Sequence, residues 1–184
     1  LISINCSKRP IILINYKKKR WKMTKVIIIR GNSGSGKSSL AKELQNRIGF
    51  QTLLISQDTI RREMLYDKPD NKTVELIDYL IRYGLENCDY MIIEGILKEH
   101  RYGNMLRKHF AGKKNVFTYY YDISFEETLR RHKNKKNAEF GKEEMSNWFV
   151  AHDYLGLENE KIIKEHISLN DMVEKVLEDI NFKE

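Results

Sequence analysis

Residues 31–38 read Gly-Asn-Ser-Gly-Ser-Gly-Lys-Ser and match the phosphate-binding pattern G-x-x-x-x-G-K-[ST]. The apolar run 26–29 before the motif is typical of a buried strand, and Leu40 and Leu44 after it share one helical face. In this context, glycine lets backbone N–H groups turn toward a phosphate, and the helix N-terminus adds partial positive charge. We therefore predict a nucleotide phosphate site formed by Gly31, Asn32, Ser33, Gly34, Ser35, Gly36, Lys37, Ser38 and Ser39.

Two side chains of the motif have separate expected roles. Lys37 is expected to reach the β and γ phosphates of the nucleotide, and Ser38 is expected to hold a Mg²⁺ ion. The alternative is a glycine-rich turn before an ordinary helix, which the rarity of the full pattern disfavours.

Four further runs resemble strands, at 52–56, 90–94, 116–121 and, more weakly, 161–163. Helical periodicity lies between them, at 72–88, 97–110, 124–134, 141–152 and 169–181. Strands alternating with helices imply a parallel sheet covered on both faces. The prediction is an α/β fold of three layers with a mainly parallel five-stranded sheet, in one domain spanning residues 23–184.

The amino-acid composition limits the class of protein to which this chain can belong. The 184 residues are 41% hydrophobic and 32% charged, which predicts a globular domain without a membrane-spanning run of about 20 apolar residues. The two cysteines, Cys6 and Cys88, have no metal-binding spacing. We expect a reducing, cytoplasmic location and no disulfide framework.

The net charge of +7 comes entirely from residues 1–22, which carry seven basic and no acidic residues. The remaining 26 basic residues are balanced by 26 acidic ones, so the domain itself does not predict a nucleic-acid partner. Codons for the stretch 19–23 can include a ribosome-binding sequence just before Met23. We expect 1–22 to be a translated leader outside the fold; the alternatives are a basic arm or a targeting peptide.

In α/β sheets, ligands bind beyond the carboxyl ends of the strands. After the run 52–56 come Asp58 and Arg61. Asp58 is a candidate general base for a hydroxyl, and Arg61 can orient it or bind an anionic part of a substrate. The other interpretation of Asp58 is a helix N-cap.

Glu94 ends the third apolar run, at the position of a Walker-B acid. A carboxylate there can hold Mg²⁺ through its water shell. An ordinary acid at a strand end and a contact with substrate are the alternatives for this residue.

A dense cationic stretch covers residues 130–136. It begins on a predicted helix and ends in a loop, which suits a lid over transferring phosphates. Arg130 and Arg131, at its helical start, are the candidates for offsetting negative charge in a transition state. A solvated face is the alternative interpretation.

With these features the chain resembles the small P-loop kinases, a group with nucleoside and nucleoside-monophosphate kinases, chloramphenicol phosphotransferase, zeta-type toxins and phage polynucleotide kinase. The resemblance covers about residues 23–181 and rests on the Walker A loop, on Ser56–Arg61 and on Asp122–Arg131. Within this group the chain most resembles bacterial proteins described as uridine kinase-like, although no motif in the sequence selects uridine.

The resemblance implies Mg²⁺-dependent transfer of the ATP γ-phosphoryl group to a hydroxyl. Lys37 would hold phosphates, Asp58 would take the proton, and Ser38 with Glu94 would hold the metal. A small acceptor such as a nucleoside, antibiotic or metabolite is expected, bound by a monomer or homodimer. Nucleic-acid 5′ ends and a nucleotide-dependent switch or ATPase are the alternatives.

Overall fold

The computed structural model describes residues 23–66, 72–133, 140–165 and 167–182. The predictions for 1–22 and for the loop half of the cationic stretch lie outside these residues. In the described part of the chain, five strands form one sheet in the order β2-β3-β1-β4-β5, and all neighbours are parallel. The strands are β1 (Lys25–Gly31), β2 (Thr52–Ser56), β3 (Tyr90–Gly95), β4 (Val116–Tyr121) and β5 (Glu160–Ile163).

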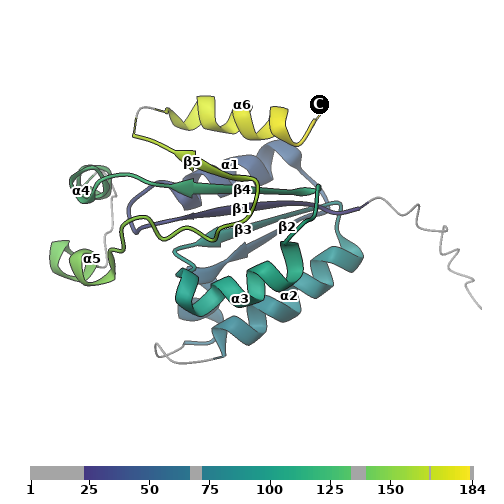
Figure 1. Ribbon diagram of the computed structural model, residues 1–184, viewed down its shortest axis with the longest axis horizontal. Helices are drawn as coiled ribbons and strands as arrows, with labels where there is room; N and C mark the ends of the chain where they lie inside the picture. The colour runs from purple at the N-terminus through teal and green to yellow at the C-terminus, as the bar shows by residue number, and fades with distance from the viewer. Residues whose placement is uncertain (1–22, 67–71, 134–139, 166, 183–184) are drawn as a thin grey trace, which may run out of the picture.

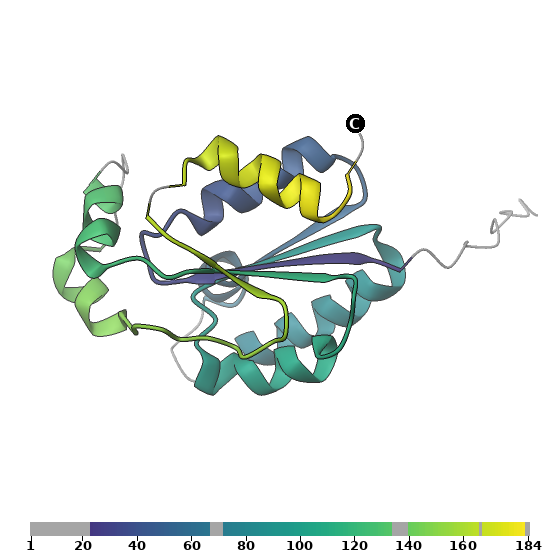
Figure 2. The same ribbon diagram turned by 45° about the horizontal axis from the view of Figure 1, so that its top comes forward.

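Helices cover both faces of the sheet (Figures 1 and 2). One face carries α1 (Lys37–Ile48) and α6 (Leu169–Asp179), and the other carries α2 (Thr73–Asn87) and α3 (Glu99–Phe110). The short helices α4 (Phe125–Lys133) and α5 (Lys142–Trp148) lie together beyond one end of the strands (Figure 1). The predicted three-layer α/β architecture is confirmed.

The position of β1 in the centre of the sheet explains why its residues are apolar at successive positions, without alternation. Val26 and Ile28 pack in the core against α2 and α3, whereas Ile27 and Ile29 pack in the core against α1 and α6. Successive side chains of a strand point to opposite faces, so a strand that is buried on both sides needs apolar residues at every position. The run 26–29 thus places the phosphate loop at the middle of the sheet.

Two local elements differ from expectation. A π-helix, η1 (Thr59–Met64), begins shortly after β2, where the sequence suggested a helix start only as the alternative interpretation of Asp58. Helix α5 ends at Trp148 instead of residue 152, because the next residue, Phe149, takes extended dihedral angles (φ −66°, ψ 129°). No helix in the described ranges is both long and apolar enough to cross a membrane.

Candidate active site

The loop between β1 and α1 is held tightly by its neighbours. Gly34 has φ +81°, and a Cβ at this position would lie 2.6 Å from the carbonyl oxygen of Thr128. Gly31, with φ +142°, would place a Cβ 2.8 Å from that of Tyr121. Only glycine fits at both positions, since any side chain would clash and the backbone conformation disfavours L residues.

Lys37, the first residue of α1, is almost fully buried against the loop that precedes it. Its ammonium donates to the carbonyl oxygen of Asn32 at 2.8 Å and to Ser35 Oγ at 3.4 Å. The Asn32 amide in turn donates to the Val150 carbonyl at 2.8 Å and accepts from the Val150 N–H at 2.9 Å. The side chain of Asn32 therefore ties the loop to the segment after α5, while the lysine ammonium lies inside the loop's backbone.

Ser38 and Glu94 meet beside the loop, although they are far apart in the sequence. Ser38 Oγ donates to Glu94 Oε2 at 3.1 Å, and Ser56 Oγ donates to the other carboxylate oxygen at 2.5 Å. Glu94 is buried, and its register partner on β2 is Ser56. A hydroxyl and a carboxylate at this spacing form the hard oxygen donor set that Mg²⁺ prefers.

In the ranges that the structure describes, no three His, Cys, Asp or Glu side chains gather into a metal-binding group. Mg²⁺ keeps several waters and is usually bound by one or two protein oxygens together with substrate phosphates.

The two arginines of α4 have different surroundings. Arg131 Nη1 donates to the Ser35 carbonyl oxygen at 2.8 Å, and its Nη2 donates to the Glu165 carbonyl at 3.0 Å. Arg130 is 68% exposed and pairs with Glu127 at 2.6 Å. Hydrogen bonds from Arg130 and then Arg131 lower the pKa of Glu127 to about 2. The structure thus brings Arg131, and not Arg130, to the phosphate loop.

A pocket of about 400 Å³ opens beside the loop. Its lining comes from the phosphate loop, from the β2–η1 junction and η1, from the segment between β3 and α3, from the first turn of α3, and from α5 together with Phe140 shortly before it. The lining residues are Ser33, Gln57, Asp58, Arg61, Arg62, Ile96, Lys98, His100, Arg101, Tyr102, Phe140 and Trp148. The predicted residues Asp58 and Arg61 therefore share a cavity with the phosphate loop.

Asp58 occupies the N-cap position of η1, but its side chain makes no capping hydrogen bond. Its carboxylate is 62% exposed and lies 3.6 Å from Arg61 Nη2 and 3.8 Å from Arg62 Nε. The capping role considered for this residue is therefore not what positions the carboxylate. The two arginines hold it at the pocket, which leaves its oxygens accessible.

Gln57 fixes the pocket wall opposite η1. Its carbonyl oxygen accepts from the Leu97 N–H at 2.8 Å, and its amide donates to the Tyr102 hydroxyl at 3.1 Å. A Cβ on Gly95 would lie 2.5 Å from the Gln57 side chain. The Gln57 side chain, just after β2, thus holds the segment between β3 and α3 in place through hydrogen bonds.

A buried arginine that the sequence predictions missed supports the same segment. The guanidinium of Arg30, which is inaccessible to solvent, donates to the Leu97 carbonyl through Nε at 3.1 Å and Nη2 at 2.8 Å. It also pairs with Asp153 at 2.8 Å and with Glu160 at 3.3 Å. A basic residue directly after the apolar run 26–29 was the signal that could have revealed it.

Lys98, Arg101, Phe140 and the pocket position of Trp148 were also not predicted as site features. Lys98 and Arg101 follow β3 within a few residues, so the rule that ligands bind beyond strand ends could have identified them. Phe140 and Trp148 contact each other edge to face, with centroids 5.1 Å apart. Their place at the pocket depends on how α5 docks, for which the sequence has no signal.

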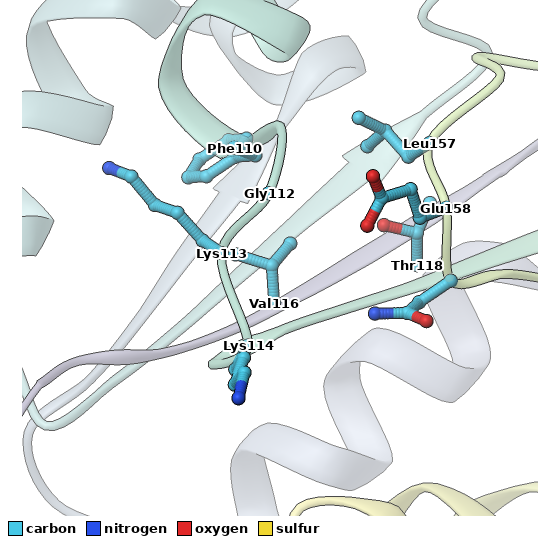
Figure 3. Close-up of a pocket in the computed structure, with 9 residues that line it drawn as sticks. Phe110, Gly112, Lys113, Lys114, Val116, Thr118, Leu157 and Glu158 are labelled. Atoms are coloured by element: carbon cyan, nitrogen blue, oxygen red, sulfur yellow. The ribbon is translucent and has the colours of Figure 1, made fainter.

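A separate pocket of about 200 Å³ lies away from this site (Figure 3). Figure 3 shows it between the turn after α3, with Phe110 and Lys113, and the segment of Leu157 and Glu158. Its sheet residues, Val116 and Thr118, belong to the amino-terminal half of β4. The phosphate loop lies at the carboxyl end of the neighbouring parallel strand β1, so this pocket is not part of the site.

Comparison with known proteins gives a family and a fold. A family model described as an AAA domain matches residues 26–145. No curated protein matches the sequence significantly.

Several solved structures are similar over nearly the whole chain. The Mycobacterium tuberculosis APS kinase CysC, in complex with AMPPNP and APS, has a TM-score of 0.66 at 17% identity and covers 86% of this chain and 98% of its own. A gluconokinase from Sinorhizobium meliloti 1021 has a TM-score of 0.61 at 16% identity, covering 89% and 94%. The Deinococcus radiodurans tunicamycin resistance protein has a TM-score of 0.60 at 12% identity, covering 87% and 97%. At these identities the likeness concerns the fold.

Proposed function

The chain belongs to the AAA domain family, and from this membership and the geometry of its site we propose that it is a kinase. The proposed reaction moves the γ-phosphoryl group of ATP–Mg²⁺ to a hydroxyl of a small molecule. Two of the similar structures are described as kinases, so this fold is known to carry a reaction of this kind.

One observation carries the proposal: the phosphate loop and a carboxylate share one pocket. Ser33 of the loop and Asp58 both line the cavity of about 400 Å³. A nucleotide-dependent switch needs a phosphate site but no adjoining chamber for an acceptor. A kinase needs both, with the acceptor hydroxyl held between a base and the γ-phosphate.

In the proposed step, the acceptor oxygen forms a bond to the γ-phosphorus while the bond from that phosphorus to the β–γ bridging oxygen breaks. ADP leaves with that electron pair, and Asp58 accepts the hydroxyl proton. Lys37 and the loop amides hold the phosphates, and Arg131, already hydrogen-bonded to the loop, offsets their charge. Arg130 would join them only after leaving its pairing with Glu127.

Ser38 and Glu94 are the residues that would hold Mg²⁺, since their oxygens meet beside the loop at 3.1 Å. When bound, the ion would neutralise charge on the β and γ phosphates. Glu94 also accepts from Ser56 Oγ through its other carboxylate oxygen, which helps to orient the carboxylate.

The acceptor is proposed to be small. A cavity of about 400 Å³ is in the range of small-ligand pockets and suits a molecule such as a nucleoside, an antibiotic or a metabolite. The balanced charge of residues 23–184 disfavours the 5′ end of a nucleic acid as the acceptor.

A phosphotransfer screen with labelled ATP tests the proposal, using nucleosides, nucleotides, sugars, sugar acids, aminoglycosides, phenicols and RNA oligonucleotides. We expect label transfer to at least one small acceptor. Asp58→Asn should lower that rate by about 10²-fold, the lower end for general-base assistance, with ATP affinity nearly unchanged. Asp171→Asn, on the remote helix α6, is the matched control and should have no effect.

Label released only as inorganic phosphate, at the same rate with and without acceptors, would mark a switch or ATPase and overturn the proposal. If Asp58→Asn kept full turnover, Asp58 would not be the general base.

A further inference from the structure

The wall of the pocket that follows β3 has an unfavourable backbone conformation. Ile96 and Lys98 line the pocket, and Leu97 between them is inaccessible to solvent and lies in the hydrophobic core. Leu97 has φ +43°, in the left-handed region that residues other than glycine seldom adopt. Such a conformation persists only where the surrounding structure holds it, so the contacts of Leu97 are the ones that fix this wall.

Side chains on β1 and just after β2 bind both polar groups of the Leu97 backbone. The Leu97 N–H donates to Gln57 Oε1 at 2.8 Å. The Leu97 carbonyl oxygen accepts from Arg30 Nε at 3.1 Å and from Arg30 Nη2 at 2.8 Å. The backbone at Leu97 can therefore change its conformation only by giving up three hydrogen bonds.

Asp153 binds the other end of the same wall. Its carboxylate lies 2.8 Å from Arg30 Nη2 and accepts the Glu99 N–H at 3.0 Å and 3.2 Å. Glu99 is the first residue of α3, and the N-cap residue Lys98 makes no capping hydrogen bond through its side chain. Asp153 thus satisfies an N-terminal N–H group of α3 from a distant segment. The buried Arg30–Asp153 ion pair holds the backbone on both sides of Lys98.

The same ion pair lies next to the phosphate loop. Arg30 directly precedes the loop, and the side chain of Asn32 within the loop forms two hydrogen bonds with the backbone of Val150. Val150 is three residues before Asp153, in the segment that runs past α3 toward β5 (Figure 1). This segment is therefore joined to the phosphate loop at residue 150 and to the pocket wall at residue 153.

We propose that Asp153 is a positioning residue for the acceptor, because with Arg30 it fixes the wall of Ile96 and Lys98 relative to the phosphate loop. This inference rests on the proposed kinase function and adds to it a residue that is not among those lining the pocket. Asp153 acts through the wall and not by contact with a substrate. Its effect on transfer follows because a hydroxyl reacts with the γ-phosphorus only when the pocket holds the two in line.

Asp153→Asn is the test variant, and Glu160→Gln is its matched control. Both carboxylates pair with Arg30, at 2.8 Å and 3.3 Å, and both are largely buried, with side-chain exposures of 12% and 6%. Glu160 also accepts from two N–H groups of the segment before β5, whereas Asp153 accepts from α3. Asparagine keeps the size of aspartate but loses the charge and offers one acceptor oxygen in place of two.

The kinetic measurement uses the acceptor that takes label fastest in the phosphotransfer screen. For Asp153→Asn we expect kcat/KM for this acceptor to fall by about tenfold or more, while KM for ATP stays within about twofold of the wild-type value. Glu160→Gln should change neither quantity. A role in stability alone would affect both variants and both substrates, so this difference separates positioning from folding.

Hydrogen exchange tests the wall without any acceptor. With AMPPNP–Mg²⁺ present, the amides of residues 97–102 should exchange about tenfold or more faster in Asp153→Asn than in the wild type, as expected for the loss of a hydrogen bond to a charged group. In Glu160→Gln these amides should exchange at the wild-type rate.

Glu99→Pro removes the same hydrogen bond from the helix side and replaces Asp153→Asn if that variant does not fold. Lys98 has φ −46° and ψ 133°, a conformation that a following proline tolerates, and proline is favoured at the first position of a helix. The ring takes the place of the proton and separates the carboxylate from α3. Glu99→Ala is the control, because it removes the same side chain and keeps the N–H. We expect the proline variant, and not the alanine variant, to lose kcat/KM for the acceptor.

The inference is overturned if Asp153→Asn keeps the wild-type kcat/KM for the acceptor, or if residues 97–102 exchange at the wild-type rate in it. It is also overturned if Glu160→Gln or Glu99→Ala matches the variant that it controls, or if KM for ATP rises as much as the acceptor kcat/KM falls. Each of these outcomes leaves the kinase proposal intact, since label transfer has then been observed. A screen that finds no acceptor overturns the kinase proposal, and this inference with it.

Discussion

Replacing Arg30 with methionine should destabilise this protein more than any surface change. Its side chain is completely buried, and its five hydrogen bonds join β1 to the Leu97 carbonyl and to Asp153 and Glu160. Burial lowers the pKa of Arg30, and the two carboxylates oppose that shift. Methionine matches the apolar stem of arginine but leaves both carboxylates without their cation.

The expected cost follows from what remains around those carboxylates. Removing one partner of a buried ion pair typically costs about 3–5 kcal/mol. Here Asp153 keeps the Glu99 N–H at 3.0 Å, and Glu160 keeps the Leu155 N–H at 2.8 Å. Because these donors still solvate the carboxylates, we expect the low end, about 3 kcal/mol, which most domains survive.

Urea unfolding followed by circular dichroism measures this loss. Arg47→Met is the matched control, because the Arg47–Glu174 pair has side-chain exposures of 35% and 65% and should contribute about 0–1 kcal/mol. A loss below about 1 kcal/mol for Arg30→Met, or one equal to that of Arg47→Met, would refute the reasoning about buried charge.

Four further predictions concern the loop and its surroundings. Lys37→Met should abolish ATP-dependent phosphoryl transfer with an unchanged far-ultraviolet spectrum; wild-type turnover would exclude the proposed phosphate role. Glu94→Gln should raise the Mg²⁺ concentration for half-maximal activity by about tenfold or more, whereas an unchanged Mg²⁺ dependence would remove it from the metal site. Gly34→Ala should weaken AMPPNP binding measured by calorimetry, because its Cβ would lie 2.6 Å from a backbone oxygen, while Gly112→Ala, at φ +69° with open space around it, should bind normally. For Glu127, the pKa of about 2 lies below its ordinary 4.5, so its stabilisation is present at neutral pH and is lost as the pH falls through this range; the melting-temperature deficit of Glu127→Gln should therefore be large at pH 7 and shrink toward about pH 2, and equal deficits would contradict the pairing.

The order of strands and helices and the phosphate loop could be predicted from the sequence, because both depend on local patterns. The run 26–29 is apolar at every position, which only a strand covered on both faces requires. The glycines at 31, 34 and 36 provide the positive φ angles that the loop needs. Asp58 and Glu94 could be chosen as candidates because polar residues after parallel strands meet at one edge of the sheet.

The tertiary structure decided which of these candidates lie together and what else surrounds them. Arg130 and Arg131 are adjacent in the sequence, but only the rotation of α4 against the loop turns Arg131 toward Ser35 and leaves Arg130 in solvent. The pocket of about 400 Å³ forms because η1 and α3, which are distant in the sequence, both contribute residues to its lining. Arg30 has its partners on the segment that follows β3, on the segment before β5 and on the first residue of β5. Local sequence patterns determine which element forms and where it ends. The contacts of a side chain depend on how helices and strands pack together, and that packing is complete only when the whole core forms.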